Sequence, residues 1–210
     1  MKILVTAFDP FGSDEINPAL EALKLVDPNC TTAELIKLEI PTKFKESLEV
    51  INKVMIEEKP DAVLAIGQAG GRTALTPERV AINIQDASIK DNAGFMPTDV
   101  PVIKDGPAAY FSTLPIKEIV SNLREAGLPA TVSDSAGTFV CNNIMYGILD
   151  HQSEYQNDAI GGFLHVPFIP SQVATADRSG QASMSLQEIV KGVEISIQSI
   201  EQFLKGKDRG

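Results

Sequence analysis

The chain has 210 residues, a hydrophobic fraction of 43% and a formal net charge of −10 at pH 7. This length is enough to bury one substantial core, so we expect a single domain over residues 1–210. The acidic balance and the lack of any run of Lys or Arg argue against nucleic acid or an anionic membrane as a partner. No apolar run approaches the roughly 20 residues that span a bilayer, so we expect no membrane segment.

The two cysteines, Cys30 and Cys141, are too few for the disulfide framework of a small secreted protein. Residues 1–10 contain too short an apolar run for a secretory signal. We therefore expect a cytoplasmic protein with reduced cysteines. The sequence contains no CxxC or HExxH motif and no cluster of His, Cys and Asp at ligand spacing, so we expect neither a metal nor another cofactor.

The first half of the chain alternates between strand and helix patterns. Apolar runs predict three strands, at residues 2–8, 33–40 and 61–67. Apolar residues at helical spacing predict a helix over residues 42–58, which ends before Pro60.

Two of these strands lead into unusual loops. Residues 2–8 run into the sequence FDPFG at 8–12, where Phe8 and Phe11 either line a small apolar pocket or fill the core. Residues 61–67 run into a glycine loop with Gln68, where the backbone can approach a ligand closely. The glycine spacing fits neither a P-loop nor a dinucleotide fingerprint, so it gives little support to phosphate binding.

The second half begins with residues 87–107, which are rich in Asp, Pro and Gly and are expected to form an excursion rather than a domain boundary. Strands are then predicted at 130–133 and 160–166, and helices at 115–126, at 142–149 and after a capping box at 185–188. This alternation predicts an α/β fold, a three-layer α/β/α sandwich around a mainly parallel twisted sheet. Sites in such sheets gather at the carboxyl ends of the strands.

Cys141 follows a loop of small residues and stands at the start of the predicted helix 142–149. The free N–H groups and the dipole of a helix start favour a thiolate, which is the nucleophilic form of cysteine. The position therefore suits covalent catalysis. The alternative is a buried cysteine that packs as a small hydrophobic residue.

A cysteine nucleophile needs a base and a group that orients the base. His151 lies in a polar stretch that is most simply a solvated helix end. His165 lies in the apolar strand 160–166, where it is either the base or a hydrogen-bonded core residue. Glu78, in an apolar stretch, is a candidate for the orienting carboxylate, although a Glu beside Arg79 also fits a surface pair.

Two longer stretches carry a family resemblance. The sequence GQAGGRTALTPERVAIN at residues 67–83 and VSDSAGTFVCN at residues 132–142 resemble the glutamate and cysteine signatures of the pyroglutamyl peptidase I (pyrrolidone-carboxylate peptidase) family. Shorter blocks at residues 8–12, 109–115 and 165–167 are similar to further family blocks. The resemblance extends from near residue 1 to about residue 185.

The resemblance implies a catalytic triad of Cys141, His165 and Glu78, and an exopeptidase that removes N-terminal pyroglutamate from peptides through an acyl-enzyme. It also implies a homo-oligomer, a dimer or tetramer. The family's pocket for the lactam ring corresponds to Phe8, Phe11, Gln68, Phe139 and Val140. A flat, uncharged lactam suits a small aromatic slot with one or two polar groups.

One position departs from the family pattern. Ser88 stands where the family commonly has an arginine that is assigned a role near the reacting carbonyl. Two alternatives from other classes also stay open: a nucleoside phosphorylase-like enzyme, which would depend on phosphate, and a non-catalytic binding protein, which would hydrolyse nothing.

Overall fold

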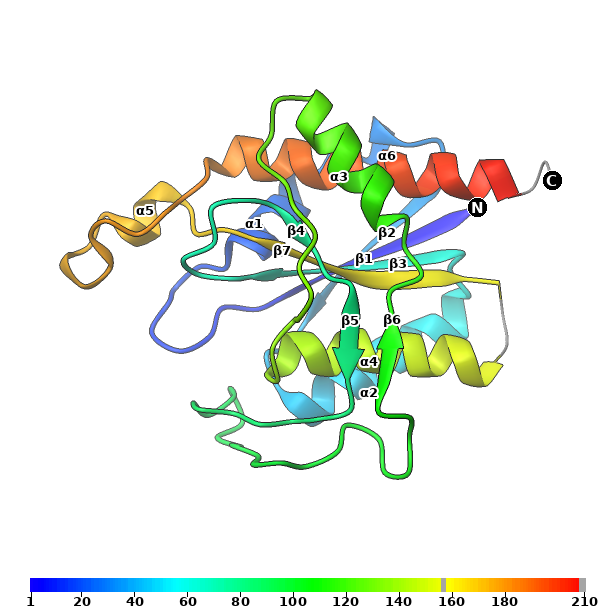
Figure 1. The fold of residues 1–210 in the computed structure, drawn as a ribbon, viewed down its shortest axis with the longest axis horizontal. Coiled ribbons are helices and arrows are strands. Elements are labelled where there is room, and N and C mark those ends of the chain that lie inside the picture. Colours follow the sequence, from blue (N-terminus) through cyan, green and yellow to red (C-terminus); the bar gives the residue numbers. More distant parts are fainter. Residues whose placement is uncertain (156–157, 208–210) are drawn as a thin grey trace.

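The computed structural model describes residues 1–155 and 158–207, and it contains a five-stranded sheet in the order β2-β1-β3-β7-β4 (Figure 1). Its strands are β1 (Lys2–Phe8), β2 (Glu34–Ile40), β3 (Ala62–Gln68), β4 (Thr76–Pro77) and β7 (Ile160–Val166). All neighbouring pairs are parallel except β4 with β7. The predicted α/β class and mainly parallel sheet are confirmed.

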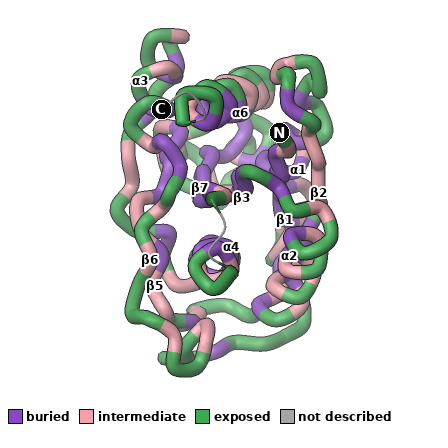
Figure 2. Tube along the Cα trace, turned by 90° about the vertical axis from the view of Figure 1, so that its right-hand side faces the viewer, coloured by how far each residue is buried: buried purple, intermediate pink, exposed green. Residues whose placement is uncertain are grey.

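Helices cover both faces of this sheet. One face carries α1 (Pro18–Leu25), α3 (Ile116–Glu125) and α6 (Leu186–Lys207), and the other carries α2 (Phe44–Glu58) and α4 (Val140–Tyr155) (Figure 1). Successive strand residues point to opposite faces, so Ile3 and Leu64 enter one apolar core while Leu4 and Val63 enter the other. Figure 2 shows the buried residues concentrated in the sheet and on the inward sides of the helices. The predicted three layers are confirmed.

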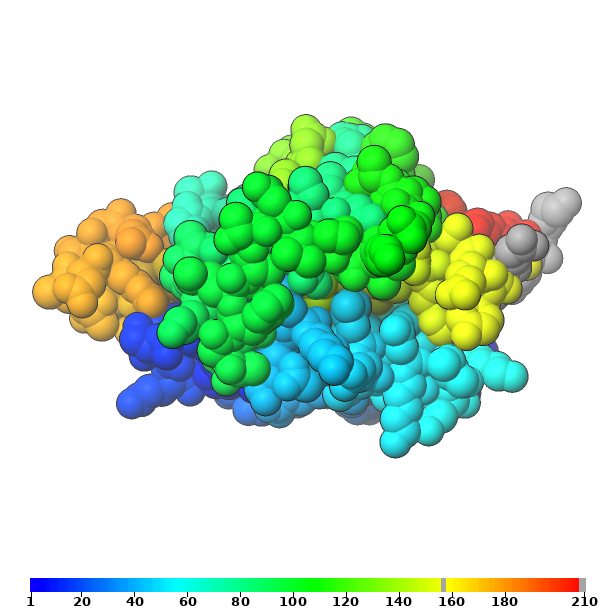
Figure 3. Space-filling model, turned by 90° about the horizontal axis from the view of Figure 1, so that it is seen from below, coloured from blue at the N-terminus to red at the C-terminus, as the bar shows by residue number. Residues whose placement is uncertain are grey.

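A small hairpin adds to this frame beside α4. It consists of β5 (Val80–Ile82) and β6 (Ala109–Phe111), two short strands that the sequence pattern did not predict. Residues 83–108 join them as an excursion that contains the predicted one, and they occupy a broad part of the face seen in Figure 3. The shorter helices are η1 (Pro28–Cys30) between α1 and β2, and α5 (Pro170–Val173) and η2 (Ala176–Arg178) between β7 and α6.

The predicted strand at residues 130–133 is wrong. This segment makes only two isolated bridges, Leu75 with Ala130 and Glu78 with Ser133. Its backbone still bonds to residues 75–79, with Thr131 N donating to Leu75 O at 3.1 Å and Ser133 N donating to Pro77 O at 3.0 Å. The bond that would join the two bridges requires an N–H at residue 77, and proline has none.

The carboxyl ends of three parallel strands lie at one edge of the sheet. β1 ends at Phe8, β3 at Gln68 and β7 just after His165. In the β3–β7 register, Gly67 is the direct neighbour of His165. This edge therefore brings together the loops in which the sequence places its candidate residues.

Candidate active site

Glu78 and His165 form a buried carboxylate–imidazole pair at this edge. β4 runs antiparallel to β7 with Thr76 opposite His165, and the Glu78 N–H donates to Phe163 O at 2.9 Å just beyond it. Glu78 is fully buried and His165 is 4% exposed. Nδ1 of His165 lies 2.6 Å from Oε1 of Glu78. Because the carboxylate only accepts, Nδ1 carries the proton and Nε2 is left as the acceptor.

Arg72 is a third member of this cluster that the sequence analysis missed. Its Nη1 donates to the same Glu78 Oε1 at 2.7 Å, and its Nη2 donates to Ser135 O at 3.3 Å. It also contacts the hydroxyl of Thr76. This contact could have been predicted, because a carboxylate in an apolar stretch requires partners for its charge and Arg72 is six residues from Glu78.

These contacts set the protonation of the pair. Burial by itself raises the pKa of Glu78, but the hydrogen bond with His165 and the charge of Arg72 outweigh it and hold that pKa below its usual value. Burial lowers the pKa of His165; Glu78 opposes this shift and Arg72 adds to it, so the pKa ends below its usual value. The resting pair at neutral pH is therefore a carboxylate and a neutral imidazole.

Cys141 is the second residue of α4 and lies beside this pair. Its Sγ is 3.1 Å from the position that a β-carbon on Gly67 would occupy, and Gly67 is the register neighbour of His165. Burial raises the pKa of the Cys141 thiol to about 12, and the charge of Glu78 also raises it. Burial therefore opposes the helix start, whose free N–H groups and dipole favour a thiolate.

The loop that carries Cys141 is held on both sides. Thr138 accepts a backbone hydrogen bond from Asp86 N at 3.0 Å and donates its hydroxyl to Asp86 O at 2.7 Å. On the other side, the buried amide of Asn142 accepts from Ile82 N at 2.9 Å and donates to Ile82 O at 2.8 Å. These bonds fix the start of α4, and with it the cysteine, against the small hairpin.

Four of the five predicted pocket residues form two pairs. Phe11 and Phe139 are half-buried neighbours, with ring centroids 6.1 Å apart. Phe8 and Val140 are each 2% exposed and belong to the core between the sheet and α4. For Phe8, this position agrees with the alternative of a core residue.

Gln68, the fifth predicted pocket residue, is half-buried at the end of β3. Its Nε2 lies 3.3 Å from Oδ2 of Asp14, and its Oε1 accepts from Nε2 of Gln172 at 2.8 Å. Both partners were missed from the sequence, because they lie 54 and 104 residues away.

Comparison with known proteins identifies the chain. The family model described as pyroglutamyl peptidase matches residues 1–203. The chain belongs to the pyroglutamyl peptidase family. It is 54% identical over 199 residues to the pyrrolidone-carboxylate peptidase of Clostridium botulinum (strain Alaska E43 / Type E3), covering 95% of this chain and 92% of that one. A Streptococcus pyogenes serotype M12 (strain MGAS2096) pyrrolidone-carboxylate peptidase is 53% identical and covers 100% and 95%.

Solved structures of pyroglutamyl peptidases have the same fold. Pyroglutamyl peptidase I from Bacillus amyloliquefaciens superposes with a TM-score of 0.91 at 42% identity, over 96% of this chain and 97% of that one. A mutant pyrrolidone carboxyl peptidase from the hyperthermophile Pyrococcus furiosus gives 0.93 at 39% identity, over 97% and 100%. The chain is thus a cysteine peptidase of the pyroglutamyl peptidase type, and neither the phosphorylase nor the binding-protein alternative is supported.

Ser88, the departure from the pyroglutamyl peptidase pattern, lies exposed in the excursion at residues 83–108. It is two residues from Asp86, which is hydrogen-bonded to the cysteine loop through Thr138. A longer side chain at this position therefore starts close to the loop that carries the nucleophile.

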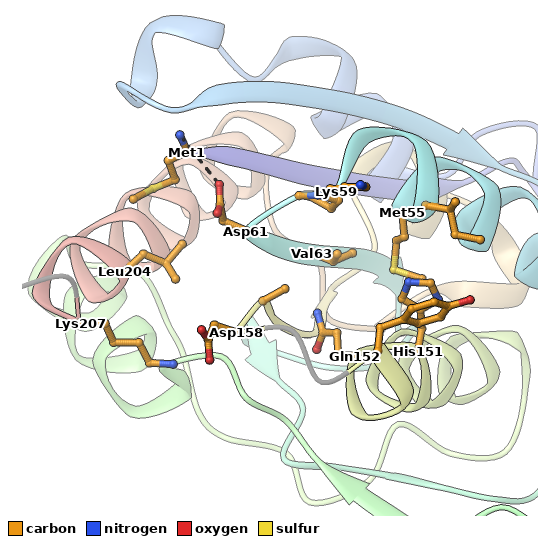
Figure 4. Close-up of a pocket in the computed structure, with 14 residues that line it drawn as sticks. Met1, Met55, Lys59, Asp61, Val63, His151, Gln152, Asp158, Leu204 and Lys207 are labelled. Atoms are coloured by element: carbon orange, nitrogen blue, oxygen red, sulfur yellow. Dashed lines mark ion pairs between the residues drawn. The ribbon is translucent and has the colours of Figure 1, made fainter.

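A separate cavity of about 970 Å³ lies at the opposite edge of the sheet (Figure 4). Met1 and Asp61 line it near the starts of β1 and β3, and Gln152 and Lys207 line it from the last turns of α4 and α6. None of the predicted site residues is among those that line it. His151 does line it, so the structure separates this histidine from the Glu78–His165 pair.

The described part of the chain holds neither a cluster of metal ligands nor a membrane-spanning helix. Over residues 1–155 and 158–207, no three His, Cys, Asp or Glu side chains gather closely enough to hold a metal ion. Over the same residues, no helix combines the length and the apolarity that a membrane crossing requires.

Proposed function

We propose that this chain removes N-terminal pyroglutamate from peptides with Cys141 as the nucleophile, His165 as the general acid and base, and Glu78 as the group that orients the imidazole. The observation that carries the proposal is the 2.6 Å contact between Nδ1 of His165 and Oε1 of Glu78, both buried. The Cys141 sulfur lies 3.1 Å from the position that a β-carbon would take on Gly67, the register neighbour of His165. A thiol, an imidazole and a carboxylate in this order are what a cysteine nucleophile needs.

In the first half of the reaction, Nε2 of His165 takes the thiol proton as the sulfur attacks the carbonyl carbon of pyroglutamate. Burial raises the pKa of the Cys141 thiol, which favours transfer of its proton together with the attack. The negative charge that forms on the carbonyl oxygen is stabilised by backbone N–H groups at the start of α4. The imidazolium then gives its proton to the departing amine, the C–N bond breaks, and a thioester remains.

In the second half, His165 takes a proton from water, and the hydroxide attacks the thioester carbonyl. The C–S bond breaks, the sulfur regains a proton from the imidazolium, and free pyroglutamate leaves. Glu78 keeps the proton on Nδ1 throughout and stabilises the imidazolium in both halves. The charge of Arg72 adds to the effect of His165 in lowering the pKa of Glu78, which favours the carboxylate form for that role.

The lactam ring packs against the adjoining rings of Phe11 and Phe139, with Phe8 and Val140 behind them in the core and Gln68 hydrogen-bonding the ring. The proximity of the Phe11 and Phe139 rings and the place of Gln68 at the end of β3 support this assignment. Pyroglutamate lacks a free α-amine, so a slot without an unpaired carboxylate suits it. With Ser88 in place of arginine, the backbone N–H groups near Cys141 supply the stabilisation of the oxyanion.

We also propose that residues 1–210 form one domain and that the protein is a cytoplasmic homo-oligomer, a dimer or tetramer. Residues 208–210 lie outside the described part. Two cores on a single sheet support one domain. Exposed apolar side chains on and beside the excursion, including Phe111 at 73% and Phe95 at 49%, support a contact between copies. Light scattering of the purified protein tests the oligomeric state, and fractionation of cells tests the cytoplasmic location.

A chromogenic pyroglutamyl amide, assayed with and without iodoacetamide, tests the function. We expect turnover that is independent of phosphate and that disappears in step with alkylation of Cys141. Absence of turnover, or full activity in Cys141→Ala, would contradict the proposal.

A further inference from the structure

The amide of Gln68 is held at both ends by side chains from distant segments. Its Nε2 lies 3.3 Å from Oδ2 of Asp14, in the loop after β1, and its Oε1 accepts from Nε2 of Gln172, in α5, at 2.8 Å. Gln172 is 7% exposed. The same Gln172 nitrogen lies 3.4 Å from Oδ2 of Asp14, which closes the cluster.

The direction of every bond in this cluster is dictated by groups that act only one way. The backbone N–H of Ile169 donates to Oε1 of Gln172 at 3.1 Å, so Nε2 of Gln172 must point to Gln68. The atom of Gln68 that meets this donor must be its oxygen. Its nitrogen then faces the Asp14 carboxylate, which only accepts. The backbone at one end and the carboxylate at the other therefore exclude the flipped amide of Gln68.

Arg178 completes the cluster by neutralising Asp14. Its Nη1 lies 2.7 Å from Oδ1 of Asp14, on the carboxylate oxygen that Gln68 does not use. The guanidinium carbon stands 4.6 Å above the centre of the Phe168 ring, which fixes the arginine from the other side. The Phe168 ring in turn packs on Gly70, in the glycine loop that follows Gln68. The carboxylate nearest to Gln68 is thus already paired.

We propose that Asp14, Gln172 and Arg178 determine substrate specificity by presenting Gln68 as a hydrogen-bond donor in a neutral setting. The inference rests on the proposed function, in which Gln68 binds the lactam. With one Nε2 proton committed to Asp14, the second donates to the lactam carbonyl. An N-terminal prolyl residue has the same ring but no such carbonyl, and it carries an ammonium that meets the N–H group of Gln68 rather than a free carboxylate.

The first test replaces the donor of Gln172 with an acceptor of the same shape. In Gln172→Glu, one carboxylate oxygen still accepts from Ile169, but the other faces Oε1 of Gln68 and forces that amide to turn. We expect KM for the pyroglutamyl amide to rise about tenfold or more, with a smaller change in kcat, because ring binding loses a hydrogen bond. Inhibition by free pyroglutamate should weaken by a similar factor. Ser171→Glu adds the same charge at the neighbouring exposed position and should behave like the parent.

The second test exposes the charge of Asp14. In Arg178→Gln the carboxylate loses its cation and attracts an ammonium. We expect the ratio of kcat/KM for the pyroglutamyl and prolyl amides to fall about tenfold, through better use of the prolyl substrate. Lys53→Gln, which removes a positive charge from the exposed face of α2, should leave the ratio unchanged. Arg178 is partly exposed, so we expect Arg178→Gln to fold. The ratio measured on this variant therefore tests the inference even if Gln172→Glu does not fold.

The outcomes separate the inference from the proposed function. If the parent enzyme does not cleave the pyroglutamyl amide, the proposed function fails and the inference with it. If the parent cleaves it, and both Gln172→Glu and Arg178→Gln keep the parent's KM, inhibition and substrate ratio, only the inference is overturned. Parental rates of Cys141 alkylation in the variants establish that the catalytic site itself is intact.

Discussion

The sulfur of Cys141 occupies the space that a side chain on Gly67 would need. A β-carbon at residue 67 would lie 3.1 Å from Sγ and 2.7 Å from Cζ of Phe163, whose ring is fully buried. Since Gly67 is the register neighbour of His165, the missing side chain is what allows thiol and imidazole to share one edge of the sheet.

Gly67→Ala should therefore lower both stability and turnover. Phe163 cannot move without disturbing the core, so overpacking should cost about 1–3 kcal/mol of unfolding free energy. Displacement of the sulfur should lower kcat about tenfold to a hundredfold. Gly206→Ala is the matched control, because nothing lies within 4 Å of a β-carbon there and the position is in α6. Thermal melts and kcat of the two variants check this; a Gly67→Ala enzyme as active and stable as Gly206→Ala would refute it.

Replacement of the two histidines should have opposite outcomes. His165→Ala should lower kcat about 10²–10⁴-fold, because the thiol then has no base to take its proton. The alkylation rate of Cys141 should fall with it, while that of Cys30 stays the same. His151→Ala should keep parental activity, because His151 stacks on Tyr155 at the far edge of the sheet. Steady-state kinetics and mass spectrometry of both cysteines test this, and equal losses in the two variants would contradict the assignment.

Arg72→Gln should move the acid limb of the kcat/KM profile to higher pH. The arginine charge lowers the pKa of both Glu78 and His165. Without it the imidazole protonates at higher pH and loses its role as a base. The stabilisation that ionised Glu78 gives is present above its unfolded pKa and is lost as pH falls through its folded pKa. That loss should also begin at higher pH in the variant. Arg72→Lys keeps a positive charge at this position, so its kcat/KM profile should lie closer to that of the parent than the profile of Arg72→Gln. An unchanged kcat/KM profile would show that the charge of Arg72 has no effect on the catalytic pair and that its role is structural.

Ser88→Arg tests whether the family's usual arginine is needed. If backbone N–H groups near Cys141 stabilise the oxyanion, adding the guanidinium should change kcat by less than about tenfold, equivalent to about 1.4 kcal/mol. Ser88→Lys controls for charge alone. A gain of about a hundredfold in the arginine variant only would mean that the natural chain lacks a donor it needs.

The long elements could be predicted from the sequence, and the short ones could not. β1 and β7 are continuous apolar runs, and their predicted bounds agree with the structure. β5 and β6 have three residues each and no periodicity to detect. At residues 130–133 the pattern indicates a strand, but Pro77 on the neighbouring segment interrupts the ladder and leaves isolated bridges.

The site divides in the same way. Glu78 and His165 are 87 residues apart, so their pairing was predicted through the family resemblance and not through any local pattern. Asp14 and Gln172 reach Gln68 from segments 54 and 104 residues away, which spacing does not encode. Arg72, six residues from Glu78, could have been found as the partner of a carboxylate in an apolar stretch. The helix start that favours a thiolate at Cys141 is visible in a sequence, whereas the burial that raises the pKa of this thiol is not.

The most direct measurement is the position of the acyl group during turnover. The enzyme is mixed with a pyroglutamyl amide, quenched in acid within one turnover, digested, and mapped by mass spectrometry. We expect one pyroglutamyl group, carried by the peptide that contains Cys141 and lost as free pyroglutamate appears, with Cys30 unmodified. An acyl group on any other residue, or product formed with equal speed by Cys141→Ala, would contradict it.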